Sequence, residues 1–153
     1  MYEDFEEYID LLKKLAVNSD INCKHAAALL YNNNIYSPSI NKFIKSFDIK
    51  SKNTDEIQTH YKTIHAEISV FLNFPKKKSM KGMDIIVIRI NKNLALKNSR
   101  PCNHCIDKLK KIGIRKVFYS NEDGKIISEF INDMEKIHIS SGTRLLNRIH
   151  AQI

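Results

Sequence analysis

Glycine is scarce in this sequence, with four in 153 residues, and long apolar runs are absent. Neither a G-x-x-x-x-G-K-[ST] loop nor a G-x-G-x-x-G turn occurs, which disfavours the nucleotide-binding folds that cradle phosphates on such glycines. No stretch of about 18 apolar residues is present to span a membrane. The first ten residues contain five acids and no Lys or Arg, unlike the basic start of a secretory signal. We therefore expect a soluble, intracellular protein with no membrane partner.

Cysteine is also scarce, since Cys23, Cys102 and Cys105 are the only three. An odd number of cysteines without an export signal disfavours a disulfide framework, so we expect thiols in a reducing compartment. Cys23 is most simply a small buried apolar residue. The sequence has no internal repeat and no linker rich in Pro, Gly or Ser, and its 42% hydrophobic content suits one core. These features predict a single domain over residues 1–153.

Basic residues exceed acidic ones, and the formal net charge is +8. The excess gathers in two segments, which contain Lys76, Lys77, Lys78 and Lys81, and then Lys108, Lys110, Lys111, Arg115 and Lys116. Such clusters attract phosphate-bearing partners, including single-stranded nucleic acid. A solvated, lysine-rich surface explains them equally well, so the charge alone leaves both interpretations open.

Hydrophobic periodicity predicts an alternating α/β chain. Helical spacing occurs over about 3–17, within an N-terminal amphipathic segment 1–20, over 64–74, and from Pro101 to Gly113. Pro101 suits the first position of its helix, and Gly113 suits its end. Extended segments are expected at 26–31, 35–40, 84–90, 117–120 and 125–130.

The turns between these segments set the expected connections. Three consecutive asparagines at 32–34 join the first two strands into a hairpin, and the turn at 121–124 makes the last two strands antiparallel neighbours. The polar segment 41–61 is expected to be a surface loop. The tail 131–153 has an ambiguous pattern that suits one or two short helices.

Two short motifs carry the chemistry: His65-Ala66-Glu67, and Pro101-Cys102 followed by Cys105, each at an expected helix start. Zinc prefers His nitrogen and Cys sulfur, and catalytic zinc keeps three protein ligands so that water can take the fourth position. His65, Cys102 and Cys105 supply three such ligands. Glu67 can point into the same pocket and move protons without ligating the metal.

These motifs resemble the H-x-E and P-C-x-x-C signature of the zinc-dependent cytidine and deoxycytidylate deaminase-like superfamily. The order of elements is similar over nearly the whole chain. The resemblance implies an α/β fold, namely a three-layer α/β/α sandwich around a mixed sheet of about five strands. It also implies a Zn²⁺ cofactor and hydrolytic deamination, with Glu67 as the proton carrier.

The resemblance extends to substrate contacts. In the family's opening hairpin a substrate-binding Asn commonly follows the second strand, and Asn41 matches it. His25 falls where a side chain often packs against the base, and Ala66 is a third expected contact. Arg100 departs from the pattern, because relatives often have Ser or Glu before the P-C. The antiparallel last strand resembles that of deaminases acting on free nucleosides.

The leading hypothesis is therefore hydrolytic deamination of cytosine in a nucleoside, a nucleotide or single-stranded nucleic acid, giving uracil and ammonia, in nucleotide metabolism or nucleic-acid editing. One alternative is adenine or guanine deamination on the same scaffold, because pocket shape sets the choice of base. Another is a non-catalytic nucleic-acid-binding module with structural zinc, which the single C-x-x-C pair and the intact Glu67 disfavour. A homo-oligomer stays open.

Overall fold

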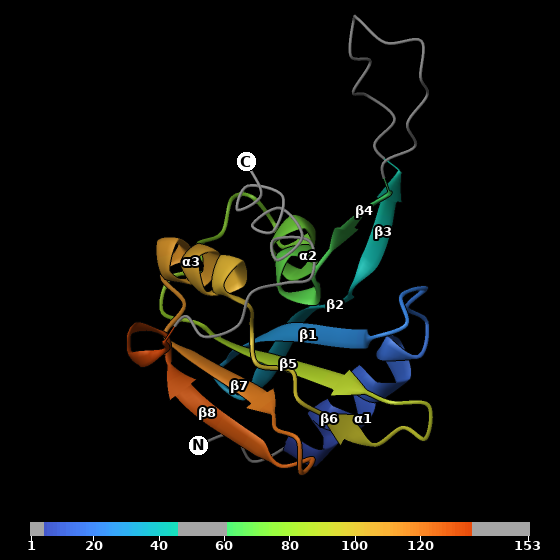
Figure 1. The fold of residues 1–153 in the computed structure, drawn as a ribbon. Coiled ribbons are helices and arrows are strands. Elements are labelled where there is room, and N and C mark those ends of the chain that lie inside the picture. Colours follow the sequence, from blue (N-terminus) through green and yellow to red (C-terminus); the bar gives the residue numbers. More distant parts are fainter. Residues whose placement is uncertain (1–4, 46–60, 136–153) are drawn as a thin grey trace, which may run out of the picture.

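A mixed β-sheet separates two helical layers in the computed structural model, which describes residues 5–45 and 61–135 (Figure 1). The strand order is β2-β1-β5-β7-β8, with β6 pairing with β5 off this path. The sheet strands are β1 (Lys24–Tyr31), β2 (Asn34–Ile40), β5 (Asp84–Ile90), β6 (Leu96–Lys97), β7 (Lys116–Ser120) and β8 (Ile126–Phe130). The helices are α1 (Phe5–Ala16), α2 (Ala66–Asn73) and α3 (Asn103–Ile112), followed by the 3₁₀ turn η1 (Ile131–Asp133).

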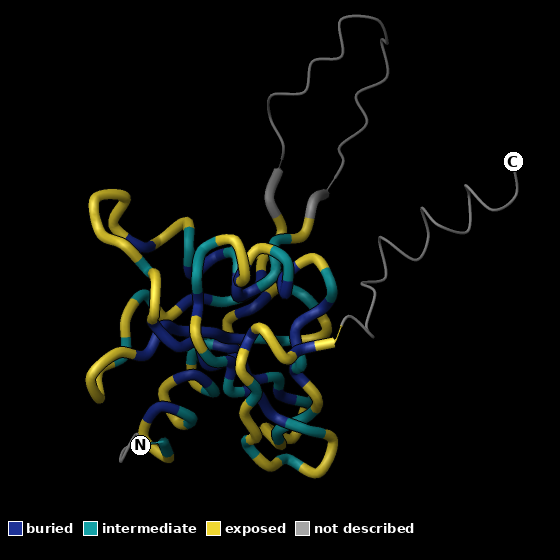
Figure 2. The backbone as a smooth tube through the Cα atoms, turned by 90° about the vertical axis from the view of Figure 1, so that its left-hand side faces the viewer, coloured by how far each residue is buried: buried dark blue, intermediate teal, exposed yellow. Residues whose placement is uncertain are grey.

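Alternation along β5 explains the layers. Ile85 and Val87 belong to the core cluster beneath α2 and α3, whereas Ile86 and Ile88 belong to the cluster beneath α1. Because side chains of a strand alternate between faces, one β-branched segment supplies both cores. Figure 2 shows the buried residues concentrated in the interior and the exposed ones mainly in the peripheral loops. The expected three-layer α/β/α sandwich is therefore confirmed.

The pairing of the strands follows the expected turns. The β1–β2 hairpin turns on Asn32 and Asn33, whose φ angles of 48° and 59° suit a tight two-residue hairpin turn. β5 and β7 are parallel, which makes the sheet mixed. β7 and β8 are antiparallel, and Gly124 has the positive φ, 78°, that their turn needs. Both predicted hairpins are confirmed.

The segment 41–61 differs from the expected loop. Its two ends form β3 (Lys42–Lys45) and β4 (Tyr61–Ile64), an antiparallel ribbon in which Lys42 pairs with Ile64 (Figure 1). Short alternating stretches at the two ends of a polar insertion can pair across it, which a reading of each end alone does not reveal. Residues 46–60 of that insertion, and most of the tail predicted to contain short helices, lie outside the described residues.

The helix α3 starts later than the sequence predicts, at Asn103. Cys102 is the N-cap, with φ of −70° and ψ of 168°, so Pro101 lies before the cap and not at the first helical position. Gly113 ends the helix as predicted, in a left-handed conformation with φ of 90°, and its N–H donates hydrogen bonds to the carbonyls of Leu109 and Lys110.

Cys23 is exposed, not buried as expected, because it precedes β1 in a connection outside the core.

The lysine-rich segment follows the C-terminal end of α2. Lys76, Lys77, Lys78 and Lys81 are exposed, and Gly82 N–H donates a hydrogen bond to the carbonyl of Gly113 at the end of α3. This basic segment therefore lies at the C-terminal ends of both helices.

Among the helices of residues 5–45 and 61–135, none has the length and hydrophobicity of a membrane-spanning segment.

Candidate metal centre and active site

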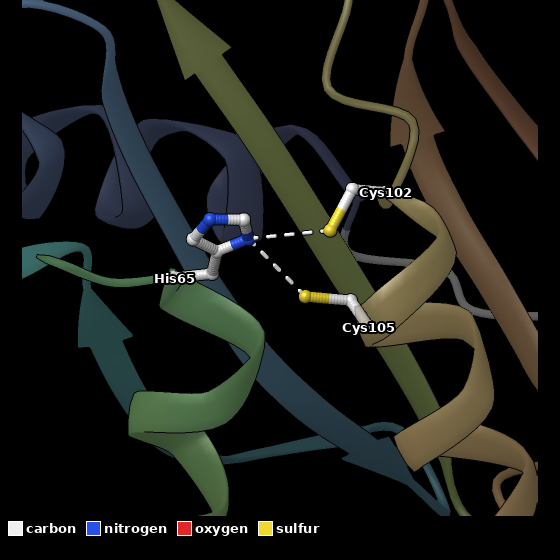
Figure 3. A group of neighbouring side chains, drawn as sticks. All are labelled: His65, Cys102 and Cys105. Carbon is white, nitrogen blue, oxygen red and sulfur yellow. Dashed lines mark hydrogen bonds between the residues drawn. The ribbon is translucent and has the colours of Figure 1, made fainter. Parts of the chain in front are cut away.

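The ends of two helices bring the three expected metal ligands together. His65 is the N-cap of α2, Cys102 is the N-cap of α3, and Cys105 lies in the first turn of α3. Both cap residues have extended backbone, and neither makes a side-chain capping hydrogen bond. Figure 3 shows the imidazole of His65 pointing at both sulfurs across the gap between α2 and α3. The positive ends of two helix dipoles thus face one set of donor atoms.

The His65 nitrogen lies at about the distance from each cysteine sulfur that tetrahedral zinc requires. His65 Nδ1 lies 3.5 Å from Cys102 Sγ and 3.3 Å from Cys105 Sγ. Zinc bonds of about 2.3 Å to sulfur and about 2.0 Å to nitrogen, at tetrahedral angles, place S and N about 3.5 Å apart. All three donor atoms lie within 4.8 Å of one another. The residues present therefore fit a zinc ion bound by His65, Cys102 and Cys105.

The pKa values of the Cys102 and Cys105 thiols are shifted in opposite directions. The hydrogen bond with the Cys105 thiol lowers the pKa of Cys102 to about 3, and His65 contributes to this shift. The same bond, burial and the Glu67 carboxylate raise the pKa of Cys105. The hydrogen bond with Cys102 also raises the pKa of His65. When only protons balance the charge, the pair carries one thiolate, whereas a bound divalent cation displaces protons and holds both sulfurs as thiolates.

Glu67 lies beside the ligands without joining them. Its side chain is buried, at 4% exposure, in the first turn of α2. Its Oε2 accepts a hydrogen bond from Cys105 Sγ at 3.2 Å. Among the described residues, however, the group with mutually close donor atoms contains only His65, Cys102 and Cys105. The carboxylate is thus held at the edge of the metal site.

The expected substrate contacts lie on the same side of the sheet. Ala66, between His65 and Glu67, is buried. Burial lowers the pKa of His25, while the charge of Glu67 opposes that shift, so the ring of His25 lies within electrostatic range of the metal site. His25 is the second residue of β1, at the start of the strand, and Asn41 directly follows β2, as expected from the sequence. Whether Asn41, His25 and Ala66 contact substrate stays a prediction.

Asn41 also has a structural role that the sequence did not reveal. Its Oδ1 accepts hydrogen bonds from Ser19 Oγ at 2.7 Å and from the backbone N–H of His25 at 3.0 Å. Its Nδ2 donates to the carbonyl of Cys23 at 2.6 Å. Asn41 therefore ties the segment before β1 to the end of β2. The amide holds the N-terminal edge of the site in place.

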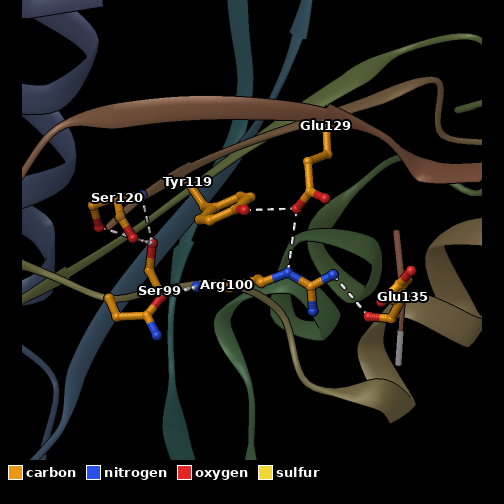
Figure 4. Close-up of polar contacts among 7 residues, drawn as sticks. Ser99, Arg100, Tyr119, Ser120, Glu129 and Glu135 are labelled. Carbon is orange, nitrogen blue, oxygen red and sulfur yellow. Dashed lines mark hydrogen bonds and ion pairs between the residues drawn. The ribbon is translucent and has the colours of Figure 1, made fainter. Parts of the chain in front are cut away.

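Arg100 anchors the loop that leads to Cys102 (Figure 4). Its Nε donates to Glu129 Oε2 at 3.2 Å, and its Nη2 donates to the carbonyl of Glu135 at 2.7 Å. The same Glu129 oxygen accepts the phenol O–H of Tyr119 at 2.6 Å. Burial and Glu129 raise the pKa of Tyr119 to about 12. The residue that departs from the family pattern thus connects this loop to β7 and β8.

Two serines brace the same loop from the other side. Ser99 Oγ accepts the backbone N–H of Ser120 at 2.8 Å (Figure 4). It also donates to the carbonyl of Val87 at 2.8 Å. Both serines are buried. These bonds join the loop before Cys102 to β5 and β7, so the position of the cysteine pair depends on the sheet.

The sequence did not single out two basic residues near the site, Arg89 and Lys97. Arg89 interrupts the β-branched segment of β5. It pairs with His25 of β1 on one side and with Lys97 of β6 on the other. The signal that was available is the charge itself, because an arginine in a strand buried on both faces is unusual. Its neighbours, however, become evident only from the register of the sheet.

Comparisons with known proteins identify similarity to cytidine and dCMP deaminases. A search of curated protein sequences found no significant match. Among solved structures, the chain is similar to a cytidine deaminase from Burkholderia pseudomallei, with 16% identity, a TM-score of 0.59, and coverage of 88% of this chain and 98% of that one. It is also similar to the dCMP deaminase of cyanophage S-TIM5 in complex with dCMP and dUMP, with 20% identity, a TM-score of 0.54, and coverage of 80% and 85%.

The apo form of the same cyanophage enzyme gives 21% identity and a TM-score of 0.56, over 80% of this chain and 86% of that one. At these identities the solved structures support the fold alone. The family model for the cytidine and deoxycytidylate deaminase zinc-binding region matches residues 2–121, which include both motifs and most of the sheet. The chain therefore belongs to the cytidine and deoxycytidylate deaminase zinc-binding family.

Proposed function

We propose that this protein is a zinc-dependent hydrolytic deaminase that converts cytosine, in a nucleoside or nucleotide, to uracil and ammonia. The observation that carries the proposal is the contact of Glu67 Oε2 with Cys105 Sγ at 3.2 Å, at the edge of a three-residue metal site. Membership of the family and the cyanophage relative, whose structure contains dCMP and dUMP, support cytosine as the base.

The number of ligands supports catalysis over a structural role for the metal. Structural zinc usually has four protein ligands, whereas catalytic zinc has three. Among the described residues, three with suitable donor atoms converge. When bound, zinc supplies the Lewis acidity that makes water a nucleophile near neutral pH.

Glu67 moves the protons in this proposal. The reaction forms a bond from water oxygen to C4 of cytosine and breaks the bond from C4 to the exocyclic nitrogen. Glu67 Oε2 takes a proton from the attacking water and delivers it to ring N3. It then takes the second proton from the new hydroxyl on C4 and delivers it to the departing amine, which leaves the C4 carbonyl. Because the side chain is buried in the first turn of α2, next to the metal ligands, the carboxylate stays in position through these steps. Ammonia leaves as a neutral molecule and the ring becomes uracil.

The remaining site residues shape the pocket. Ala66, buried between the ligand His65 and the proton carrier Glu67, is a further substrate contact in this proposal. His25 lies within electrostatic range of Glu67, where its ring can pack against the base. Asn41 Nδ2 lies 3.5 Å from His25 Nδ1, so the two side chains form one polar edge for the sugar.

A substrate panel tests this function. Zinc-loaded wild type and Glu67→Gln would be incubated with cytidine, deoxycytidine, their monophosphates, a cytosine-containing single strand, and the adenine and guanine counterparts, and ammonia would be measured. We expect ammonia release from at least one cytosine substrate with wild type and none with the variant. Release from a purine substrate alone would assign the scaffold to purine deamination. No turnover of any substrate by zinc-loaded, folded protein would favour a non-catalytic module.

A further inference from the structure

A line of three basic side chains crosses the sheet next to the metal site. His25 of β1 is directly opposite Arg89 of β5, and Arg89 is directly opposite Lys97 of β6. Directly opposite residues in antiparallel pairs point to the same face, with Cβ atoms about 4.5–5.5 Å apart. The three side chains therefore form one continuous line, which we call the basic row (His25, Arg89 and Lys97).

The basic row faces the metal site and not α1. The strand neighbours Ile88 and Ile90 pack in the α1 cluster, and Leu96 packs against it. By alternation along each strand, Arg89 and Lys97 point to the opposite face, which α2 and α3 cover. On that face His25 lies within electrostatic range of His65 and Glu67. The row thus begins at the metal site and runs away from it.

Among residues 5–45 and 61–135, no acidic group pairs with Arg89 or Lys97. The two ion pairs found in the described residues are Arg100 with Glu129 and Arg115 with Asp84. Within the same part of the chain, the guanidinium of Arg89 and the ammonium of Lys97 have no hydrogen bond to a protein group, although both residues are half-buried. Like charges directly opposite each other in a sheet are destabilising. A conflict of this kind is expected where a function requires it.

A bound anion would neutralise the like charges of Arg89 and Lys97, and the chemistry and position of the basic row favour phosphate. A planar Arg fork binds phosphate through two hydrogen bonds, and Lys adds a second positive charge. The positive ends of α2 and α3 lie on the same side of the sheet as the row. By contrast, the lysines at 76–78 and 81 are at the other ends of these helices.

We propose that Arg89 and Lys97, next to His25, bind a phosphate group of the substrate, so that the preferred substrate is phosphorylated and not a free nucleoside. This inference rests on the proposed deaminase function, whose base would occupy the metal site at one end of the row. The phosphate can belong to a nucleoside 5′-monophosphate or to the backbone of a single strand. Both sources present the same chemistry to the row.

The test measures binding separately from turnover. Calorimetric titration of the zinc-loaded wild type with deoxyuridine, dUMP and a uracil-containing single strand measures how much the phosphate contributes to binding affinity. These ligands are products, so no reaction takes place during the titration. We expect dUMP to bind about 10- to 100-fold more tightly than deoxyuridine, which is the range of one or two charge-assisted hydrogen bonds. Tighter binding of the strand alone would assign the phosphate to a polynucleotide backbone.

The variants assign the effect to the basic row. Arg89→Gln and Lys97→Gln should each reduce the ratio of dUMP to deoxyuridine affinity, whereas Arg89→Lys should retain part of it. Lys78→Gln is the matched control, because it removes the same charge at the far end of α2 and should leave the ratio unchanged. Circular dichroism would verify that each variant is folded, and the wild-type comparison requires no variant at all.

The outcomes separate the two proposals. Equal affinities of wild type for dUMP and deoxyuridine, or a ratio unchanged in both Arg89→Gln and Lys97→Gln, would overturn the phosphate subsite even if cytosine is deaminated. An affinity ratio that depends on Arg89, in protein that deaminates nothing, would support the subsite and reject the deaminase.

Discussion

Glu67 Oε2 contacts Cys105 Sγ at 3.2 Å, yet Glu67 is not among the three residues whose donor atoms converge. A carboxylate in this position can exchange protons with a group bound to the metal while leaving the ligand set unchanged. Metal binding and proton transfer should therefore be separable by mutation.

The metal should depend on the three ligands and not on the third cysteine. We expect about one zinc ion per chain in the wild type, and near-complete loss of zinc in Cys102→Ala and Cys105→Ala, with a lower melting temperature. Cys23→Ala is the matched control, since this thiol is exposed and outside the site, and it should retain zinc. Metal analysis of purified protein measures all four; well-folded wild type without zinc contradicts the assignment.

Loss of the Glu67 carboxylate should abolish turnover and spare the metal. Glu67→Gln is expected to retain one zinc ion and the wild-type fold. It should lower kcat by about 10²- to 10⁴-fold, because the proton carrier is gone. Glu122→Gln, at an exposed turn position, should behave as wild type. If zinc is lost together with the Glu67 carboxylate, Glu67 is a ligand and the mechanism proposed above is wrong.

Asn41 should affect both stability and substrate binding. Asn41→Ala leaves the N–H of His25 without its partner and removes the amide bond to the carbonyl of Cys23, which should lower the free energy of unfolding by about 1–3 kcal/mol. Ser19→Ala removes a further hydrogen bond of Asn41, the one from Ser19 Oγ, without touching the pocket. Denaturant unfolding should show losses in both variants, whereas KM should rise only in Asn41→Ala. An equal change of KM in the two would show that Asn41 acts through structure alone.

Tyr119 should make stability depend on alkaline pH. The pKa of Tyr119 is raised to about 12 in the folded protein, so the unfolded chain releases this proton first as pH rises. The stabilisation is complete below about pH 10, the ordinary tyrosine value, and is lost as pH rises towards 12. The difference in unfolding free energy between wild type and Tyr119→Phe should therefore shrink over that interval. A constant difference from pH 8 to 12 would argue against the contact with Glu129.

The lysine-rich segment should contribute little to catalysis on small substrates. α2 has eight residues, so its two ends lie about 12 Å apart, beyond the screening length of about 8 Å at physiological salt. Changing Lys76, Lys77, Lys78 and Lys81 to Gln together should leave kcat/KM for a nucleotide within about twofold of wild type. Binding of a single strand over a salt series tests the other interpretation, because loss of phosphate contacts would flatten the salt dependence.

Much of the molecule follows from local pattern. The β-branched segment 84–90, the helix that Gly113 ends, and the turn at Gly124 each follow from the conformational preferences of a few neighbouring residues. The metal ligands were predictable for a similar reason, since His65, Cys102 and Cys105 occur in two short motifs whose spacing reflects the chemistry of zinc. The β3–β4 ribbon and the exposure of Cys23 were not predicted, because strand pairing and burial depend on partners distant in sequence.

The sequence by itself thus determined the donor set, the α/β class and the acid next to the metal, because chemistry and periodicity act over a few residues. Only the tertiary structure decided that Arg89 stands between His25 and Lys97, since strand register joins residues that no local pattern relates. It also decided that Asn41 holds the segment before β1 and that Arg100 pairs with Glu129. The physical reason is the same in each case: a side chain acquires partners across the sheet only when the hydrophobic faces of distant strands have set their alignment.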